Sequence, residues 1–195
     1  MQTVRLSQAA AQPWRNGGGT TQELLAWPDA AAWRLRLSVA RIDRSGPFSA
    51  YPGVMRDFAV LQGRGVRLTW GERTTVLTPD SEVLTFDGGA PPGCELIDGA
   101  TLDLNLMVQQ RAGTGGLLRA QADQAWSSTA RWRGVYTATT ATLHLPGARP
   151  LTLAADTLMW DAEAWPKPWA LSPMSDTLRA WWVHFEDRTD GAAAA

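Results

Sequence analysis

The sequence contains little cysteine or histidine, and each shortage excludes a class of chemistry. Cys94 is the only cysteine among 195 residues, so an internal disulfide, a CxxC redox pair and a thiolate metal centre are all excluded. His144 and His184 are the only histidines, so a site with three histidine ligands cannot form. We expect Cys94 to be a buried, unreactive thiol.

Charge of one sign and long apolar runs are also missing. The 18 Lys and Arg residues balance 19 Asp and Glu residues, and the formal net charge is -1, so nucleic acid is not an expected partner. No stretch reaches the roughly 18 apolar residues that span a bilayer, and the first residues lack the apolar core of a signal peptide. The sequence therefore predicts a cytoplasmic protein that has no membrane partner.

What the chain does contain is alternation of apolar and polar residues with a period of two, which predicts strands. In residues 33–39 the apolar side chains share one face, and Arg34, Arg36 and Ser38 share the other. Residues 102–108 alternate in the same way.

Further strands are expected along the chain, separated by turns rich in glycine and proline. Residues 66–77 predict a hairpin whose two-residue turn begins at Gly71. Other strands are predicted over residues 83–86, 135–142, 143–145, 151–153, 158–160 and 180–186. A polar, glycine-rich junction at 109–116 precedes a segment, 117–126, that we expect to be helical or irregular. Many short strands at this spacing predict an all-β sandwich or barrel.

The most distinctive segment is Pro13–Glu23, in which an aromatic residue, a cation and an amide precede three glycines. Consecutive glycines permit positive φ and close approach of a ligand or a neighbouring strand. The segment is not a phosphate loop, because no Gly-Lys-Ser/Thr follows at the required spacing, and the dinucleotide fingerprint is absent as well. It therefore predicts a binding site of another kind.

Three other kinds of site are weaker alternatives. A cluster of His144, His184 and Glu186 could in principle hold a divalent metal, but strand histidines without a metal are the preferred interpretation. No Gly-x-Ser-x-Gly elbow indicates a serine nucleophile. The 11 tryptophans would suit a carbohydrate-binding surface, although most are expected in the core. Trp181 and Trp182 project to opposite faces of a strand, which leaves exposure of one of them open.

Polar side chains also stand at strand positions where apolar ones would be allowed. These positions are Arg15, Asn16, Thr20, Thr21, Glu23, Arg34, Ser38, Asp103 and Asn105. A turn-rich segment, 46–56, ends in a further arginine, Arg56. If these strands line one barrel, they form a polar pocket in which guanidinium groups can bind a carboxylate and amides or hydroxyls can bind other oxygens.

The ordered series of motifs at 13–23, 33–38, 46–56, 61–63, 86–88 and 103–107 resembles the HutD/Ves family. The resemblance implies a bicupin, with an N-terminal cupin-like barrel over 1–112 that carries the pocket and a C-terminal barrel over 113–190. Because the sequence ends in four alanines, we expect a disordered tail over 191–195. It also implies a bacterial protein of histidine utilisation or of a related stress response, and it brings no established reaction. We expect no cofactor and no metal.

Ten positions match the family's pocket motif: Trp14, Asn16, Thr20, Glu23, Arg34, Ser38, Ser49, Arg56, Asp103 and Asn105. The chain departs from the motif at Arg15, where the family usually has lysine, and at Met55, where it has an acid. The first change keeps the charge but alters its geometry. The second removes a partner that Arg56 would otherwise have.

We therefore expect a protein that binds a small anionic metabolite, such as N-formylglutamate or urocanate, and limits histidine utilisation. Arg34 and Arg56 are expected to clamp the carboxylate, and Glu23 and Asp103 to orient these arginines. The polar groups expected to bind the rest of the ligand are Asn16, Thr20, Ser38 and Asn105. The alternative is a cupin-type isomerase or hydrolase that uses Glu23 or Asp103 as general base, with or without a metal. A homodimer is compatible with the sequence.

Overall fold

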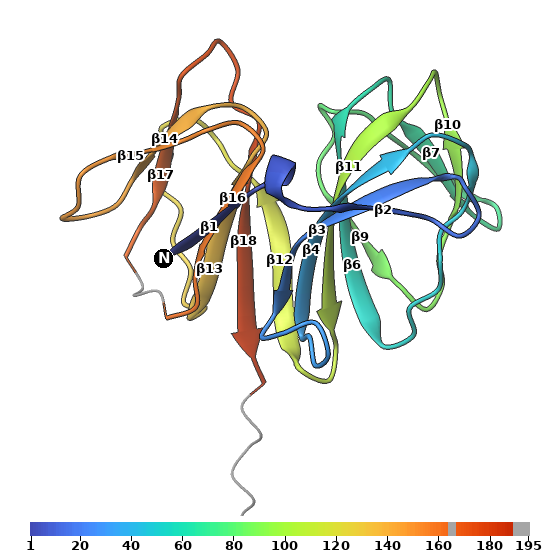
Figure 1. Ribbon diagram of the computed structural model, residues 1–195, viewed down its shortest axis with the longest axis horizontal. Helices are drawn as coiled ribbons and strands as arrows, with labels where there is room; N and C mark the ends of the chain where they lie inside the picture. Colours follow the sequence, from blue (N-terminus) through green and yellow to red (C-terminus); the bar gives the residue numbers. More distant parts are fainter. Residues whose placement is uncertain (164–166, 189–195) are drawn as a thin grey trace, which may run out of the picture. The chain divides into compact units, whose positions relative to one another are not determined.

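The computed structural model describes residues 1–163 and 167–188, so the expected tail at 191–195 lies outside the described residues. These residues form strands and one short 3-10 helix, η1 (Leu6–Gln8), which confirms the all-β class. The strands divide between two compact units (Figure 1). We call Ala9–Gly113 the N-terminal barrel, and Met1–Gln8 together with Thr114–Ala195 the C-terminal barrel. No helix among the described residues is long and apolar enough to cross a membrane.

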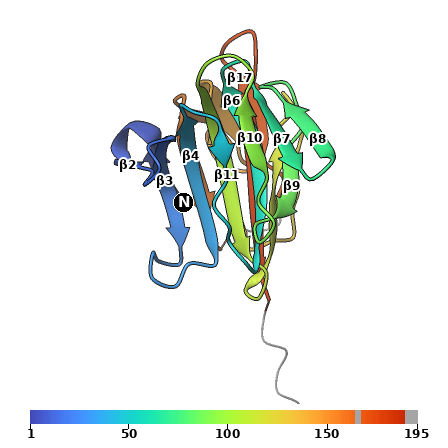
Figure 2. The same cartoon turned by 90° about the vertical axis from the view of Figure 1, so that its right-hand side faces the viewer.

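The N-terminal barrel is built from two antiparallel sheets. The first has the strand order β2-β3-β4-β11-β6-β9, with bounds Ala11–Pro13, Gly19–Trp27, Leu35–Ile42, Thr101–Gln109, Val54–Gln62 and Leu84–Asp87. The second has the order β5-β10-β7-β8, with bounds Gly46–Pro47, Gly93–Leu96, Val66–Trp70 and Arg73–Leu77 (Figure 2). The predicted hairpin at 66–77 is confirmed, and Gly71 opens its turn with a φ of 54°.

Alternation on these strands produces a core between the two sheets. Ile42, Phe58 and Val60 from the six-stranded sheet pack in one cluster with Val66 and Leu68 from the four-stranded sheet. The opposite face of the six-stranded sheet is aliphatic and also buried, as the sequence alternation at 33–39 and 102–108 predicted. Buried polar residues of this sheet therefore find hydrogen-bond partners only among groups inside the barrel.

The C-terminal barrel also consists of two sheets. The five-stranded sheet has the order β1-β16-β13-β18-β12, with bounds Gln2–Arg5, Thr157–Asp161, Trp132–Thr137, Ala180–Asp187 and Gly113–Arg119. The three-stranded sheet has the order β15-β14-β17, with bounds Leu151–Leu153, Ala141–His144 and Ala170–Pro173. Trp181 and Trp182 project from β18 to opposite faces, and both are buried.

The two barrels repeat one strand arrangement. The series β4-β11-β6-β9 in the first barrel corresponds to β12-β18-β13-β16 in the second, and β10-β7-β8 corresponds to β17-β14-β15. Each series keeps the same order along the chain and the same neighbours within its sheets. This repetition is the structural basis of a chain with two cupin-like barrels.

The structure corrects the sequence expectations at three places. The strands expected at 135–142 and 143–145 are Trp132–Thr137 and Ala141–His144, and residues 138–140 lie between them. Residues 1–8 belong to the C-terminal barrel, because β1 pairs with β16 from Gln2 opposite Trp160 to Arg5 opposite Thr157. The segment 117–126 was expected to be helical or irregular. Its first residues instead continue β12, and the remainder is irregular, as one of the two alternatives predicted, with a bridge from Trp126 to Trp169.

Candidate functional site

The inner face of the six-stranded sheet presents its side chains in rows that run across the strands. The first row is Arg36, Met107, Arg56 and Phe86. The second row is Glu23, Ser38, Asn105 and Phe58. Residues that are directly opposite in an antiparallel sheet project to the same face, and neighbouring strands lie about 4.8 Å apart. Two arginines of the first row therefore flank Met107 on one surface.

Six residues of these rows line a cavity of about 490 Å³ in the N-terminal barrel: Arg36, Met107, Arg56, Ser38, Asn105 and Phe58. Its polar lining comes from Gln12, Arg15, Asn16, Thr21, Arg36, Ser38, Ser49, Tyr51, Arg56 and Asn105. Its apolar lining comes from Pro13, Trp14, Ala40, Ile42, Pro47, Phe48, Phe58 and Met107. No carboxylate lines the cavity, so its lining charge is positive.

Arg56 is the buried cation of this cavity, with an exposed fraction of 5%. Its Nη2 donates a hydrogen bond of 2.7 Å to Oδ1 of Asn105. Its guanidinium carbon lies 5.0 Å from the ring centre of Phe48 and 5.1 Å from that of Phe86. Among the described residues, Nε of Arg56 has no hydrogen-bond partner, and no acid forms an ion pair with this side chain.

Burial changes the pKa of Arg56 but not its charge at neutral pH. Desolvation lowers the pKa of its guanidinium to about 10, while the interaction with Tyr51 acts in the opposite direction. The group therefore remains protonated at neutral pH. A buried positive charge held by aromatic rings and one amide, with an unused donor, is a strong site for an anion.

Arg36 lies in the same row but has an acidic partner. Its Nε forms an ion pair with Oε2 of Glu23. The N–H bond does not point at this oxygen, so the contact is not also a hydrogen bond. Both side chains are partly buried, with exposed fractions of 26% and 31%. Glu23 therefore orients an arginine, as the sequence suggested, but the arginine is Arg36.

The segment Pro13–Glu23 contributes one wall of the cavity. Trp14 donates from its ring nitrogen to Oγ1 of Thr21 at 2.8 Å, and Oδ1 of Asn16 accepts from the backbone N–H of Gly18 at 3.0 Å. Gly17 has a φ of 67°. A Cβ on Gly19 would lie 2.1 Å from the carbonyl oxygen of Arg41, so the close approach of β3 to β4 requires glycine here.

Asp103 lies in the third row, beside Ala40 and Val60, and is fully buried. Its Oδ2 accepts a hydrogen bond of 2.7 Å from Oγ1 of Thr101, and its Oδ1 has no partner among the described residues. Desolvation raises the pKa of Asp103 to about 7, against the smaller lowering effect of the Thr101 hydrogen bond. Its hydrogen bond goes to a threonine, which corrects the expectation that Asp103 orients an arginine.

Six of the ten expected site residues line the cavity: Trp14, Asn16, Ser38, Ser49, Arg56 and Asn105. The remaining four do not: Thr20, Glu23, Arg34 and Asp103. Arg34 is exposed and precedes the first residue of β4, so it lies beyond the wall that Arg36 forms. Thr20 is paired with the exposed Arg41, whereas Thr21 is paired with Ala40 of the cavity.

Several lining residues were not among the expected ones. Arg36 could have been found from its alternation with Ser38, which puts both side chains on one face. Gln12, Phe48 and Tyr51 carry no such signal, because they lie in an edge strand and in the loop segment around β5. Only the folded chain brings that loop to the sheet.

The histidines lie outside this cavity. His144 contacts Oγ of Ser172 at 2.9 Å through Nε2, and Ser172 donates to Oδ1 of Asp123 at 2.6 Å. Within residues 1–163 and 167–188, no three side chains of His, Cys, Asp or Glu form a cluster suited to a metal ion.

Comparisons of the sequence point to one family. The family model described as HutD matches residues 6–174. A 21.2 kDa protein of the hutC 3' region from Pseudomonas putida is 38% identical over 112 residues, which are 55% of this chain and 57% of that protein. Protein Ves from Cronobacter sakazakii is 35% identical over 98 residues, 50% of this chain and 54% of that protein. The matched part therefore spans little more than half of these curated relatives.

Solved structures match the whole arrangement. A conserved protein of unknown function from Pseudomonas aeruginosa PAO1 has a TM-score of 0.85 at 27% identity, covering 95% of this chain and 98% of that chain. HutD from Pseudomonas fluorescens, described for a formate condition, has a TM-score of 0.84 at 26% identity, covering 96% and 99%. Oxalate decarboxylase from Bacillus subtilis has a TM-score of 0.62 at 8% identity, covering 97% and 78%, a likeness of fold alone. The predicted bicupin fold is confirmed.

Proposed function

Because the chain belongs to the HutD family, which is associated with histidine utilisation, we propose that it binds a small anionic metabolite of histidine degradation. N-formylglutamate and urocanate are the two candidates of suitable chemistry. On this proposal the protein is a non-catalytic cytoplasmic sensor, and occupancy of the cavity limits histidine utilisation.

The observation that carries the proposal is that the charge of Arg56 is buried and has no acidic partner. A buried charge without an ionic partner is costly in a folded protein, and the residue that carries this one lines the cavity. A ligand carboxylate would supply the missing charge and accept from the guanidinium fork. The aromatic rings around the guanidinium would exclude water from that contact and strengthen it.

The rest of the cavity supports a ligand larger than a simple ion. Ser38 and Asn105 lie next to one another in the second row and offer a hydroxyl and an amide. Trp14, Phe48 and Phe58 offer apolar surface for a planar or aliphatic body. The two carboxylates considered as a general base, Glu23 and Asp103, are outside the cavity lining, so no observation here favours the catalytic alternative.

Ligand binding is tested by thermal unfolding and calorimetry of the full chain. Urocanate and N-formylglutamate at millimolar concentration are expected to raise the melting temperature, because a ligand that binds only the folded state stabilises it by mass action. Arg56→Gln is expected to abolish the rise, because the amide carries no charge to pair with the carboxylate.

A second buried arginine provides the matched control. Arg133 in β13 has an exposed fraction of 1% and is outside the cavity lining. Arg133→Gln is therefore expected to reduce stability while the ligand still raises the melting temperature. If urocanate, N-formylglutamate, formiminoglutamate and histidine all leave the wild-type melting temperature unchanged, the proposed function is wrong.

A further inference from the structure

Arg36 and Arg56, the two arginines on the sheet side of the cavity, differ in how their charge is balanced. Arg56 has only the amide of Asn105 and aromatic rings around it. Arg36 shares its charge with Glu23, which is bound to it from the neighbouring strand β3. The row that holds both guanidinium groups therefore provides one uncompensated positive charge rather than two.

This difference decides which anions the cavity accepts. A carboxylate at Arg56 meets a cation that has no other anionic partner. A second carboxylate bound to Arg36 would lie close to the carboxylate of Glu23, because both would contact the same guanidinium group. Two negative charges that share one cation in a partly buried site repel each other substantially. A neutral oxygen or ring nitrogen at the same place could still accept a hydrogen bond from Arg36 without that repulsion.

Arg15 does not remove this restriction. It lines the cavity but is exposed to solvent, and an ion pair at an exposed position is screened and contributes little. The charge in the less exposed part of the cavity is therefore set by Arg56 and by the Arg36–Glu23 pair.

We propose that Glu23 makes the cavity selective for acids with a single carboxylate and a neutral hydrogen-bonding group at the other end. The inference rests on the proposed function, since it names the charge class of the acid that binds there. Among the candidates above, it favours urocanate over the doubly charged N-formylglutamate.

The test uses two ligands of the same shape that differ by one charge. N-formylglutamine carries one carboxylate and a neutral amide, whereas N-formylglutamate carries two carboxylates. Calorimetry of the wild-type chain at low ionic strength is expected to show at least about tenfold tighter binding of N-formylglutamine. Tighter binding of N-formylglutamate would overturn the inference while leaving the proposed function intact.

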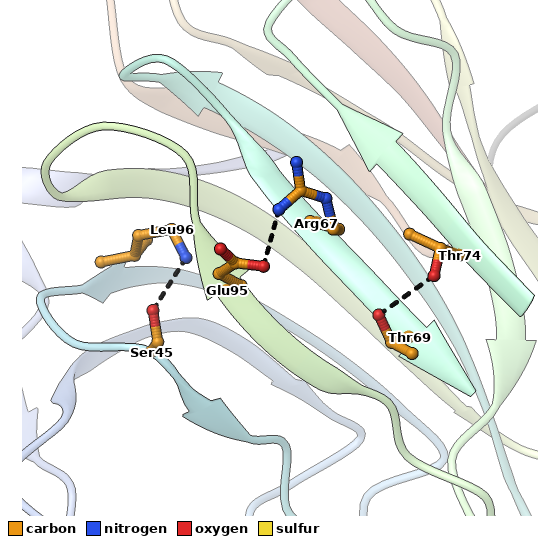
Figure 3. A network of polar contacts seen from close by, with 6 residues as sticks. All are labelled: Ser45, Arg67, Thr69, Thr74, Glu95 and Leu96. Atoms are coloured by element: carbon orange, nitrogen blue, oxygen red, sulfur yellow. Dashed lines mark hydrogen bonds and ion pairs between the residues drawn. The ribbon is translucent and has the colours of Figure 1, made fainter. Parts of the chain in front are cut away.

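Glu23→Gln tests the residue that is responsible. The substitution keeps the shape of the side chain and frees the charge of Arg36, so we expect the preference to fall by about tenfold or to reverse. The matched control is Glu95→Gln, which breaks another arginine–glutamate pair: Nη1 of Arg67 contacts Oε2 of Glu95 at 2.7 Å on the exposed side of the four-stranded sheet (Figure 3). This variant is expected to keep the wild-type preference.

A further variant separates a local effect from a general loss of structure. Arg36→Gln leaves Glu23 unpaired beside the cavity, so it is expected to weaken N-formylglutamate more than N-formylglutamine. An unchanged preference in Glu23→Gln, with a melting temperature that shows a folded protein, would contradict the inference. If neither ligand binds the wild-type chain, the proposed function fails and the inference fails with it.

Discussion

Arg56 is a buried cation in the interior of the N-terminal barrel, and its surroundings hold it in one place. Aromatic rings at about 5 Å hold the guanidinium in place, and Asn105 fixes its orientation through Nη2. Neither contact neutralises the charge. Because both contacts come from the protein itself, the side chain is held in position without a ligand. A preorganised cation of this kind gains more from an anion than a flexible surface arginine does.

Asp103 leads to a prediction about pH. Burial raises the pKa of its carboxyl group to about 7 in the folded chain, whereas an unfolded aspartate titrates near pH 4. Between these values the folded state binds more protons than the unfolded state. The free energy of unfolding should therefore fall as pH rises from about 4 to about 7, by at most roughly 4 kcal/mol from this residue.

Urea unfolding between pH 4 and pH 8 measures this dependence. Asp103→Asn is expected to remove the residue's share of the slope, because the amide does not titrate. Asp98→Asn, on an exposed loop, is the control and should leave the slope unchanged. A wild-type slope that persists in Asp103→Asn would show that other groups cause it.

At the scale of elements, Gly17, which precedes β3, and Gly19, its first residue, have different roles. Gly17 has a φ of 67°, and a Cβ added there would meet nothing within 4 Å, whereas a Cβ on Gly19 would clash with the backbone of Arg41. Gly17→Ala should therefore cost only about 1–2 kcal/mol of stability, for the left-handed conformation. Gly19→Ala should cost at least about 2 kcal/mol, because β3 must move away from β4.

Chemical denaturation of the two variants compares these costs directly. Ligand binding offers a second measure, because β3 carries Thr21 and Glu23 beside the cavity. Gly19→Ala is expected to weaken binding and Gly17→Ala to keep it. Equal destabilisation by both substitutions would contradict the assignment of close approach to Gly19.

Strand faces could be predicted from alternation, but strand ends and glycine-rich strands could not. The sequence placed Arg34 and Arg36 on one face, yet nothing in it indicates that β4 begins at Leu35. The strand β12 was missed because Gly113–Arg119 has no alternation. Gly115 explains why, since a Cβ there would lie 2.5 Å from the carbonyl oxygen of His184. Close pairing of β12 with β18 requires glycine at this position, and glycine interrupts the alternation of apolar and polar residues by which a strand is recognised.

At the scale of the whole molecule, the repeated strand arrangement gives each barrel a buried arginine on an equivalent strand. Arg56 is on β6 and Arg133 is on β13, and both lie over aromatic rings, Arg133 at 5.0 Å from that of Trp169. The environments then differ. Arg133 donates to the carbonyl oxygen of Lys167 at 2.9 Å. Desolvation lowers the pKa of Arg133, and the negative charge of Asp161 acts in the opposite direction. The C-terminal barrel thus supplies a negative charge from its own residues, and the N-terminal barrel does not.

The assignment of residues 1–8 to the C-terminal barrel predicts where their removal acts. Without β1, the outer edge of β16 loses the partner that pairs with Thr157–Trp160, and the hydrogen bond from Leu6 to the carbonyl oxygen of Asp156 is lost. Hydrogen exchange of a chain without these residues should show faster exchange in β16 than in β6 or β11, because local opening follows local loss of pairing. Faster exchange confined to β6 and β11 would mean that the first residues stabilise the N-terminal barrel instead.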